Sequence, residues 1–551
     1  MVNPSTTTAH LIVEELLAFG AKHVVLAPGS RSAPLAFAFA QAANAGMIQL
    51  HVRIDERDAG FLALGLAKSS QTIVPILVTS GTAVANLMPA VIEAYHSAVP
   101  LVVLSADRPA SARGKSAPQI IEQEHLFGHF VKDAVDLVPQ VTNIDPVTKA
   151  LTTALTTHQG PVQINVQFDV PLVPESADLD WKPEFTQSVE LSNLNAEVVP
   201  AVDDEVVELP SHGVVIAGDL TKQLDSKQAQ KLAQELGWPI IWEPSANVHD
   251  AANSVSHGVL LLTNENAPQP EAVVTVGTVG LSRPVLQLLN KVSTHVAIHC
   301  QGQGPDIPDP AQSGPRIIRG FPKVTTEVDT SWLPMWQILD AQVSEIVADE
   351  LRLDTVNGPA ACNLVWNHAP DGSQLLVAAS WPVRHLEAYA PKRSGLRVYG
   401  NRGVNGIDGL ISTAWGVAST STERTYLLIG DIAFLHDIGG INVADGEVHP
   451  SLTIVVLDND GGGIFSQLEQ GAQEYQQYFE KVFGTPHGKD LWQIAESFGY
   501  PATRVTTCSE LESALQKTDN IPGVHVIVCM TGTRSDEVSL IRSIAQRVAT
   551  L

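Results

Sequence analysis

Short apolar runs rich in valine, isoleucine and leucine alternate with amphipathic helical patterns along the 551 residues of the chain. This alternation is typical of βα units and predicts parallel sheets covered by helices. The first helical face is formed by Ala9, Ile12, Val13, Leu16 and Leu17. We expect Ser5 or Thr6 to cap this helix and Gly20 to follow its end. The first strands are predicted at 24–26, 73–78, 101–105 and 162–166, with a helix over 83–97.

Two changes in composition predict the domain organisation. The stretch from about 171 to 210 is rich in proline and acidic residues and is interpreted as a linker, and a weaker break lies near 354–359. Further strands are predicted at 213–218, 239–242, 272–277, 295–300, 375–378, 397–399, 426–429, 452–457 and 524–529. We therefore expect an α/β protein with three doubly wound parallel-sheet domains, at 1–180, 190–350 and 355–551.

The charge balance excludes several kinds of partner. With 33 Lys and Arg against 59 Asp and Glu, the formal net charge is −26, which is the wrong sign for binding nucleic acid or an anionic membrane surface. No apolar run approaches the ~18 residues of a membrane span, and the first residues lack the pattern of a secretory signal. The four cysteines include no CxxC pair, which fits a reducing cytosol. We expect a cytoplasmic protein without nucleic-acid or membrane partners.

The last predicted domain carries the most informative motif. One strand ends at Gly430-Asp431, and the next ends at Asn459, twenty-eight residues after Asp431 and just before a run of three glycines. Ligands of open parallel sheets bind at the carboxyl ends of the strands. Mg²⁺ prefers oxygen ligands, commonly one or two side chains together with substrate phosphates. The side chains of Asp431 and Asn459 and the carbonyl of Gly461 are therefore predicted to bind Mg²⁺, or alternatively Mn²⁺, together with a diphosphate.

A GD…NDG pair at this spacing resembles the cofactor motif of the thiamine-diphosphate-dependent enzymes. The resemblance implies a pyrimidine-binding, a central and a diphosphate-binding domain, with a glutamate after the second strand of the first domain. Glu56, in the segment HVRIDER, matches that position. A protonated carboxyl beside the pyrimidine ring favours the imino form that deprotonates the thiazolium carbon, and a dry interface favours that protonated carboxyl. Glu56 is therefore the predicted catalytic residue and a cofactor contact.

Other cofactor contacts follow from the same resemblance. A large apolar residue is needed to bend thiamine diphosphate so that its two rings meet, and Ile407 is the candidate. The remaining implied contacts are Thr82, Gly430, Ile432, Ala433, Gly462, Gly463 and Ile464.

Five arginines stand in turns that contain glycine or serine at expected strand ends: Arg31, Arg108, Arg283, Arg384 and Arg402. The guanidinium group matches a carboxylate as a planar fork. Because the metal and the backbone already serve the diphosphate, these arginines are surplus to the cofactor. They indicate substrates with several carboxylates, whereas a decarboxylase of simple 2-oxo acids needs an apolar pocket.

The motifs APGSRSAPL, IDER, TSGTAVAN, SADRP, NRGVNGIDG and GGGIF are similar to those of one family of this class, the synthases of menaquinone biosynthesis. The resemblance implies a transferase that decarboxylates 2-oxoglutarate and adds the succinyl carbanion to isochorismate in a Stetter-like 1,4-addition. It implies that Ser380 and Arg384, on one face if this stretch is helical, hold the distal carboxylate. The other implied substrate contacts are Ser30, Arg31, Arg108, Gln119, Arg283, Arg402 and Phe465.

The sequence departs from the family pattern at Ser282, Pro118 and Asp458, where that family often has lysine, asparagine and asparagine. The resemblance also implies a homodimer or a dimer of dimers, with each active site between the first domain of one chain and the third domain of another. One alternative is another thiamine-diphosphate-dependent 2-oxo acid decarboxylase or an acetolactate-synthase-like carboligase. A dinucleotide-dependent oxidoreductase is disfavoured because no GxGxxG motif stands at a strand–helix turn. A scaffold without activity is disfavoured because Glu56, Asp431 and Asn459 are all present.

Overall fold

The computed structural model describes residues 3–156, 159–184, 189, 206–220, 222–300, 304, 306–519 and 521–551. The chain divides into two compact units. Unit 1 consists of Met1–Val199, Asp408–Thr420 and Asp437–His449, and unit 2 consists of Pro200–Ile407, Ser421–His436 and Pro450–Leu551. Much of the predicted linker, at 185–188 and 190–205, lies outside the described residues. The limits of the three predicted domains stay a prediction.

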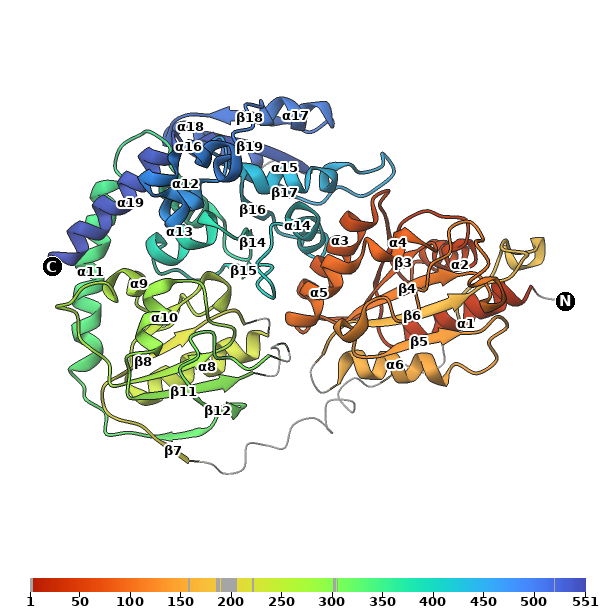
Figure 1. Ribbon diagram of the computed structural model, residues 1–551, viewed down its shortest axis with the longest axis horizontal. Coiled ribbons are helices and arrows are strands. Elements are labelled where there is room, and N and C mark those ends of the chain that lie inside the picture. Colours follow the sequence, from red (N-terminus) through yellow and green to blue (C-terminus); the bar gives the residue numbers. More distant parts are fainter. Residues whose placement is uncertain are drawn as a thin grey trace. The chain divides into compact units, whose positions relative to one another are not determined.

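Unit 1 is built on a six-stranded sheet in the order β2-β1-β3-β4-β6-β5, in which every pairing is parallel. Its strands are β1 (His23–Leu26), β2 (Gln49–Val52), β3 (Val74–Val78), β4 (Leu101–Asp107), β5 (Ala134–Leu137) and β6 (Val162–Gln167). One face is covered by α1 (Pro4–Ala18), α2 (Ala33–Asn44) and α6 (Asp145–Leu155), which share a core with the strands. Against β1 and β3 packs α3 (Glu56–Ser70), which also contacts α5 (Met88–His96) and α14 (Leu410–Ala418) (Figure 1).

Two local predictions for unit 1 are wrong. The first helix begins at Pro4, and its cap is Asn3, whose side chain accepts a hydrogen bond from the Ser5 amide at 3.0 Å. The helix expected over 83–97 is two helices, α4 (Thr82–Ala85) and α5. Pro89 stands in the first turn of α5 and has no amide hydrogen to continue the hydrogen bonds of α4, so the helical ladder breaks there. Gly20 follows the end of α1 with a φ of +85°, as predicted.

Unit 2 contains two large sheets whose strand pairings are all parallel. The first has the order β12-β11-β10-β8-β9 and the second the order β15-β14-β16-β17-β19-β18. The first consists of β8 (Gly213–Ala217), β9 (Ile240–Trp242), β10 (Ala272–Val276), β11 (Thr294–His299) and β12 (Arg316–Arg319). The second consists of β14 (Gln374–Val377), β15 (Arg397–Tyr399), β16 (Thr425–Gly430), β17 (Leu452–Asp458), β18 (Ala502–Val505) and β19 (Val524–Met530). A small parallel pair is formed by β7 (Val206–Glu208) and β13 (Lys323–Thr325). The α/β class with parallel sheets is therefore confirmed.

The helices of unit 2 connect and cover these strands (Figure 1). They are α8 (Gln223–Leu236), α9 (Gly258–Leu261), α10 (Arg283–Leu289), α11 (Trp332–Glu350), α12 (Gly358–His368), α13 (Trp381–Tyr389), α15 (Asp431–His436), α16 (Gln476–Phe479), α17 (Leu491–Ser497), α18 (Cys508–Asp519) and α19 (Arg534–Ala549). Among the residues that the structure describes, no helix is both long and apolar enough to cross a membrane.

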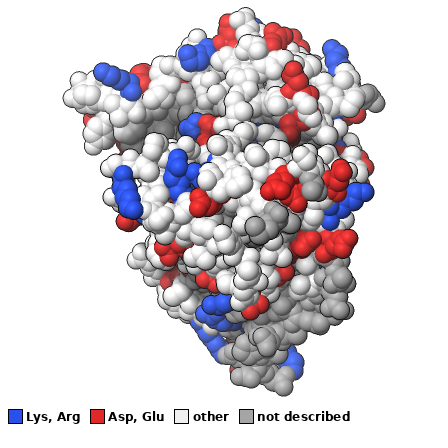
Figure 2. Space-filling model, turned by 90° about the vertical axis from the view of Figure 1, so that its right-hand side faces the viewer, with Lys and Arg blue, Asp and Glu red and all other residues white. Residues whose placement is uncertain are grey.

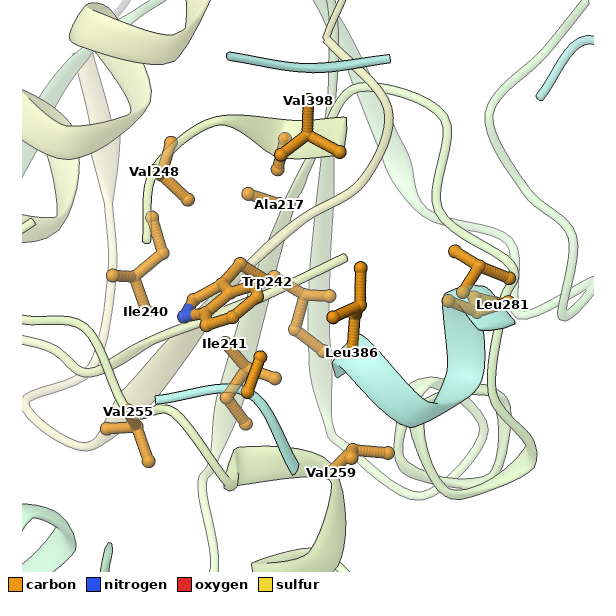
Figure 3. Packing of buried hydrophobic residues seen from close by; sticks show 14 of the residues in the cluster. Ala217, Ile240, Ile241, Trp242, Val248, Val255, Val259, Leu281, Leu386 and Val398 are labelled. Carbon is orange, nitrogen blue, oxygen red and sulfur yellow. The ribbon is translucent and has the colours of Figure 1, made fainter. Parts of the chain in front are cut away.

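One buried cluster joins the two large sheets of unit 2. Trp242, the last residue of β9, stacks on Trp366 of α12 with ring centroids 5.9 Å apart. Figure 3 shows Trp242 in the same apolar cluster as Val398 of β15 and Leu386 of α13. The side chain of Asn247 adds two hydrogen bonds to the backbone of Val398, at 2.7 and 3.0 Å. The end of β9 is thereby fixed next to β15, which brings together the residues that follow these two strands.

The surface charge fits the acidic composition. On the face drawn in Figure 2, acidic and basic side chains lie interspersed rather than gathered by sign. A nucleic-acid-binding face would gather basic side chains.

Candidate active site

A cavity of about 390 Å³ lies in unit 2, at the carboxyl ends of the strands of its six-stranded sheet. It brings together all the predicted site residues of the last domain. Those that line it are Ser380, Arg384, Arg402, Ile407, Gly430, Asp431, Ile432, Ala433, Asn459, Gly461, Gly462, Gly463, Ile464 and Phe465. The largest predicted cluster of cofactor and substrate contacts is thus a single concave site.

Asp431 and Asn459 present their oxygens at two neighbouring strand ends. Gly430 pairs with Leu457, which places Asp431, the first residue of α15, beside the end of β17. Oδ2 of Asp431 accepts hydrogen bonds from the amides of Asn459 at 3.2 Å and of Gly461 at 2.8 Å. The Oδ1 atom of Asn459 is buried and has no hydrogen-bond partner within the described residues. An unsatisfied amide oxygen beside a buried carboxylate fits a hard cation such as Mg²⁺.

The three glycines that follow are required at their positions because any side chain there would clash with neighbouring atoms. Gly461 has a φ of +137°, and a β-carbon there would lie 2.0 Å from the carbonyl oxygen of Gly484. A β-carbon at Gly462 would lie 2.4 Å from the carbonyl oxygen of Phe483, and one at Gly463 would lie 2.5 Å from the Trp381 ring. The chain can turn past these neighbours only without side chains, and it thereby leaves backbone groups close to the cavity. This cradle fits a diphosphate anchored by a metal ion.

His487 also lies at this site, although no sequence motif predicts it there. Its Nε2 atom lies 3.4 Å from Oδ2 of Asp431 and 3.4 Å from Oδ1 of Asp458, and its side chain is 6% exposed. With the two carboxylates it forms a group that resembles a metal site. However, Nδ1 of His487 accepts a hydrogen bond from the Lys489 amide at 3.0 Å. The proton of the neutral ring then resides on Nε2, which faces the two carboxylates at 3.4 Å without a hydrogen bond, and the Asp431 carboxylate raises the pKa of His487.

Asp458 and Asp460, which follow one another closely at the end of β17, have different roles at this site. Burial, followed by the nearby Asp431 carboxylate, raises the pKa of Asp458 to about 6. Asp460 accepts hydrogen bonds from the amides of His487 and Gly488 at 2.9 and 2.8 Å, which holds the 487–489 loop against the strand end. The loop carries no strand or helix pattern in the sequence, so only the fold reveals its place.

Two of the predicted substrate arginines lie at the cavity wall. Nη1 of Arg384 donates to the Ser380 carbonyl at 2.8 Å, and burial lowers the pKa of Arg384. Ser380 is the residue before α13 and has a φ of +73°, so the condition of a helical stretch is met at Arg384 but not at Ser380, and the Arg384 side chain contacts the Ser380 backbone instead. Arg402 is buried, with Nη2 3.6 Å from Oε2 of Glu243. Arg283 begins α10, is exposed and is not among the residues that line the described cavity.

The predicted residues of unit 1 lie in turns after β1, β3 and β4, which are neighbours in the sheet. Arg31 donates to the Phe168 carbonyl at 2.8 Å, and burial followed by the nearby Arg108 lowers the pKa of Arg31. Arg108 donates to the Pro118 carbonyl at 3.2 Å, and Gln119 donates to the Ser80 carbonyl at 3.0 Å. Ser30 is exposed in the turn after β1, and Thr82 is exposed as the first residue of α4, which follows β3. Ser30, Arg31, Thr82, Arg108 and Gln119 thus all follow the carboxyl ends of neighbouring strands in the sheet of unit 1.

Glu56 is the first residue of α3, and Asp55 caps this helix by accepting a hydrogen bond from the Arg57 amide at 2.9 Å. Asp55 and Arg57 also form an ion pair at 2.6 Å, which gives both of them a structural role at the start of the helix. Glu56 itself is half-buried within unit 1. Glu56 stands four residues after the end of β2 at Val52, near the strand end where the sequence motif predicted it.

Comparison with known proteins defines the class of this chain. Residues 6–126 match the N-terminal TPP binding domain of thiamine pyrophosphate enzymes, and residues 380–529 match their C-terminal TPP binding domain. These two matches contain Glu56 and the whole Asp431–Gly463 segment, respectively. The fold, the strand-end cradle and both domain matches define a thiamine-diphosphate-dependent enzyme, as predicted.

Curated relatives identify the family within that class. A relative from Saccharopolyspora erythraea is 38% identical over 96% of this chain and 95% of its own length. Relatives from Thermobifida fusca and Paenarthrobacter aurescens are 39% and 40% identical and cover 93% of this chain, with 94% and 92% of their own lengths. All three are named 2-succinyl-5-enolpyruvyl-6-hydroxy-3-cyclohexene-1-carboxylate synthase. The chain belongs to this synthase family, which confirms the resemblance to the menaquinone synthases and disfavours the acetolactate-synthase-like alternative.

Proposed function

We propose that this enzyme decarboxylates 2-oxoglutarate and transfers the remaining succinyl unit to isochorismate, with release of CO₂. The observation that carries this proposal is the cavity of unit 2, where Arg384 and Arg402 lie at the wall beside Asp431 and Asn459. A cofactor cradle alone would serve any member of the class. Two guanidinium groups next to the cradle, the buried one of Arg402 and the half-buried one of Arg384, favour a substrate that keeps a second carboxylate after decarboxylation.

We propose Mg²⁺ as the metal, with Mn²⁺ as the alternative. The side chains of Asp431 and Asn459 and the carbonyl of Gly461 would hold it, and the metal would hold the diphosphate. Thiamine diphosphate, when bound, supplies the carbon nucleophile and the electron sink that decarboxylation of a 2-oxo acid needs. The cofactor contacts proposed for this chain are Thr82, Ile407, Gly430, Ile432, Ala433, Gly462, Gly463 and Ile464.

The substrate contacts are assigned by charge. Arg384 binds the distal carboxylate of 2-oxoglutarate, with Ser380 beside it, and Phe465 forms an apolar wall. The second substrate, isochorismate, also carries carboxylates, and its proposed contacts are Ser30, Arg31, Arg108, Gln119, Arg283 and Arg402. The placement of Arg31, Arg108 and Gln119 in neighbouring turns supports their common role.

Glu56 is proposed to hold a proton toward a ring nitrogen of the pyrimidine. Among the described residues that line the cavity of unit 2, Glu56 is absent, and it belongs to unit 1. This division supports a homodimer or a dimer of dimers in which two chains complete each site. The four cysteines are free thiols, which supports a reducing compartment, and we propose the cytoplasm.

The test is turnover by the purified protein with thiamine diphosphate and Mg²⁺. We expect rapid CO₂ release from 2-oxoglutarate only when isochorismate is present, and none from pyruvate in its place. Equal CO₂ release without isochorismate, or turnover of pyruvate, would contradict the proposed reaction. Turnover of pyruvate would favour the acetolactate-synthase-like alternative.

A further inference from the structure

Glu243 is a buried carboxylate that contacts two segments of the cavity wall. It follows β9 directly and is 3% exposed. Its Oε1 atom accepts hydrogen bonds from the amides of Gly280 and Leu281, both at 2.8 Å. Its Oε2 atom faces Nη2 of Arg402 at 3.6 Å. Gly280 and Arg402 both line the cavity, whereas Glu243 lies behind them.

The Gly280–Leu281 segment is also held from its other side. Nη2 of Arg384 donates to the Leu281 carbonyl at 3.3 Å, so Leu281 is bonded through its amide to Glu243 and through its carbonyl to Arg384. Figure 3 shows Leu281 close to α13, and Trp242, the neighbour of Glu243, within the same buried cluster as Val398. The backbone that carries Glu243 is therefore fixed by tight packing.

This group contains two guanidinium groups and two buried acids, Glu243 and Glu387. A second buried acid, Glu387, lies one turn after Arg384 on α13, and burial followed by Glu243 raises the pKa of Glu387 to about 8. Burial also raises the pKa of Glu243, but Arg402 and the two amide hydrogen bonds oppose that effect. No such amide bonds reach Glu387 among the described contacts. Glu243 is therefore the acid better suited to be the counter-charge of the two guanidinium groups.

We propose that Glu243 is a positioning residue that holds Arg402 and the Gly280–Leu281 segment at the cavity wall, so that Arg384 and Arg402 meet a dicarboxylate in one fixed arrangement. Without the Glu243 carboxylate beside Arg402, the repulsion between the two guanidinium groups is no longer offset, and Arg402 loses the partner that fixes its rotamer. A substrate would then have to order Arg402 itself. This inference rests on the proposed function, because it takes the ligand to be a dicarboxylate.

The test compares Glu243→Gln with the wild-type holoenzyme. Glutamine keeps the size and one oxygen for the Gly280 and Leu281 amides, but its neutral amide removes the charge that faces Arg402. We expect a KM for 2-oxoglutarate at least tenfold higher, and binding of succinate, an unreactive dicarboxylate, at least tenfold weaker by calorimetry. The affinity for thiamine diphosphate should stay within twofold of the wild type. An unchanged KM and unchanged succinate affinity would overturn the inference.

A double-mutant cycle tests whether Glu243 acts through Arg402. In an Arg402→Gln background, adding Glu243→Gln should change the KM by less than twofold, because the partner is already gone. Independent, multiplicative effects of the two substitutions would contradict the positioning role. If Glu243→Gln fails to fold, Glu243→Asp is the variant to measure in its place. It keeps the charge but shortens the reach, and a wild-type KM in this variant would also overturn the inference.

Asp340 offers a matched control. Its carboxylate also accepts two backbone hydrogen bonds, from Ser256 at 3.1 Å and His257 at 2.7 Å, but it does not belong to the described cavity lining. Asp340→Asn should leave the KM for 2-oxoglutarate within twofold, and a rise like that of Glu243→Gln would show a general loss of stability. A wild-type enzyme that binds no succinate and consumes no 2-oxoglutarate would contradict the proposed function itself, whereas equal behaviour of wild type and Glu243→Gln contradicts only this inference.

Discussion

The Nε2 atom of His487 lies 3.4 Å from the Oδ2 atom of Asp431. Because the Lys489 amide donates to the other ring nitrogen, the Nε2 proton faces this carboxylate, and we expect the contact to help orient it. We expect His487→Ala to weaken Mn²⁺ binding about 10–100-fold, the range for loss of a partner behind a metal ligand. Electron paramagnetic resonance of Mn²⁺ titrated in the presence of thiamine diphosphate measures this directly.

His212 provides the control for that experiment. It also lies between two carboxylates, with Nε2 2.8 Å from Asp329 and Nδ1 3.4 Å from Glu271, but not at the cavity. His212→Ala should leave Mn²⁺ binding unchanged. His487→Gln, whose amide can donate to the same carboxylates, should recover part of the loss. Equal Mn²⁺ affinity in the wild type and His487→Ala would contradict the orienting role.

The close approach of Gly463 to Trp381 leads to a second prediction. An added methyl group would stand 2.5 Å from the ring and 2.9 Å from Nδ2 of Asn459, so one of these side chains must move. Overpacking of this kind costs about 1–3 kcal/mol, and we expect Gly463→Ala to bind thiamine diphosphate with Mg²⁺ roughly tenfold more weakly, since ~1.4 kcal/mol is a factor of ten. Calorimetric titration of the cofactor provides the measurement. Gly446→Ala, where a β-carbon meets nothing within 4 Å, should bind as the wild type does.

The strands that the sequence predicts are chiefly those inside the sheets. The seven residues of β4 and of β17 are all buried, because neighbouring strands and helices cover them, and each strand is therefore dominated by valine, leucine and isoleucine. The edge strands β5, β12 and β18 were missed. In β12, Arg316 and Arg319 stand exposed around two isoleucines, so the run has no clear apolar signature. The helix predicted over 83–97 is interrupted before Pro89, because proline has no amide hydrogen to continue the helical hydrogen bonds, although the apolar face continues.

Site residues that follow interior strands could be predicted from the sequence, whereas those on loops or at a sheet edge could not. Asp431 and Asn459 follow interior strands, so sheet register alone brings them together, and their sequence spacing carries that information. His487 and Glu243 reach the site by other routes. His487 is placed by hydrogen bonds between its loop and Asp460, and Glu243 by the packing of Trp242 at a sheet edge. Neither route leaves a periodic pattern in the sequence, and both residues therefore required the three-dimensional structure.

Glu56 can be tested separately from substrate binding. Because a glutamine cannot hold a transferable proton toward the pyrimidine ring, Glu56→Gln should slow hydrogen–deuterium exchange at the thiazolium carbon of added thiamine diphosphate at least a hundredfold, the lower end of general acid–base effects of about 10²–10⁴. Cofactor affinity should fall far less. Nuclear magnetic resonance of the quenched cofactor reports the exchange rate. Arg57→Gln, which breaks only the exposed ion pair with Asp55, should exchange normally. Normal exchange in Glu56→Gln would remove this residue from the mechanism.

A buried acid pair in unit 1 should make stability depend on pH. Asp437 accepts hydrogen bonds from the amide and hydroxyl of Ser412, at 2.8 and 3.2 Å, and burial, opposed by Ser412 and reinforced by Asp58, raises the pKa of Asp437 to about 8. Below about pH 4 both the folded and the unfolded chain hold the proton. As the pH rises toward 8, only the unfolded chain loses it, so the free energy of unfolding falls.

Replacing Asp437 by asparagine removes this titration and keeps one oxygen for Ser412. Between pH 5 and 8 we expect the wild type to lose about 1–3 kcal/mol more of its unfolding free energy than Asp437→Asn, since one pKa unit corresponds to ~1.4 kcal/mol. Urea unfolding at both pH values measures the difference. Asp371→Asn, which removes a carboxylate that is 81% exposed, should keep the wild-type slope. Parallel pH profiles for the wild type and Asp437→Asn would mean that the buried pair does not hold its proton at neutral pH.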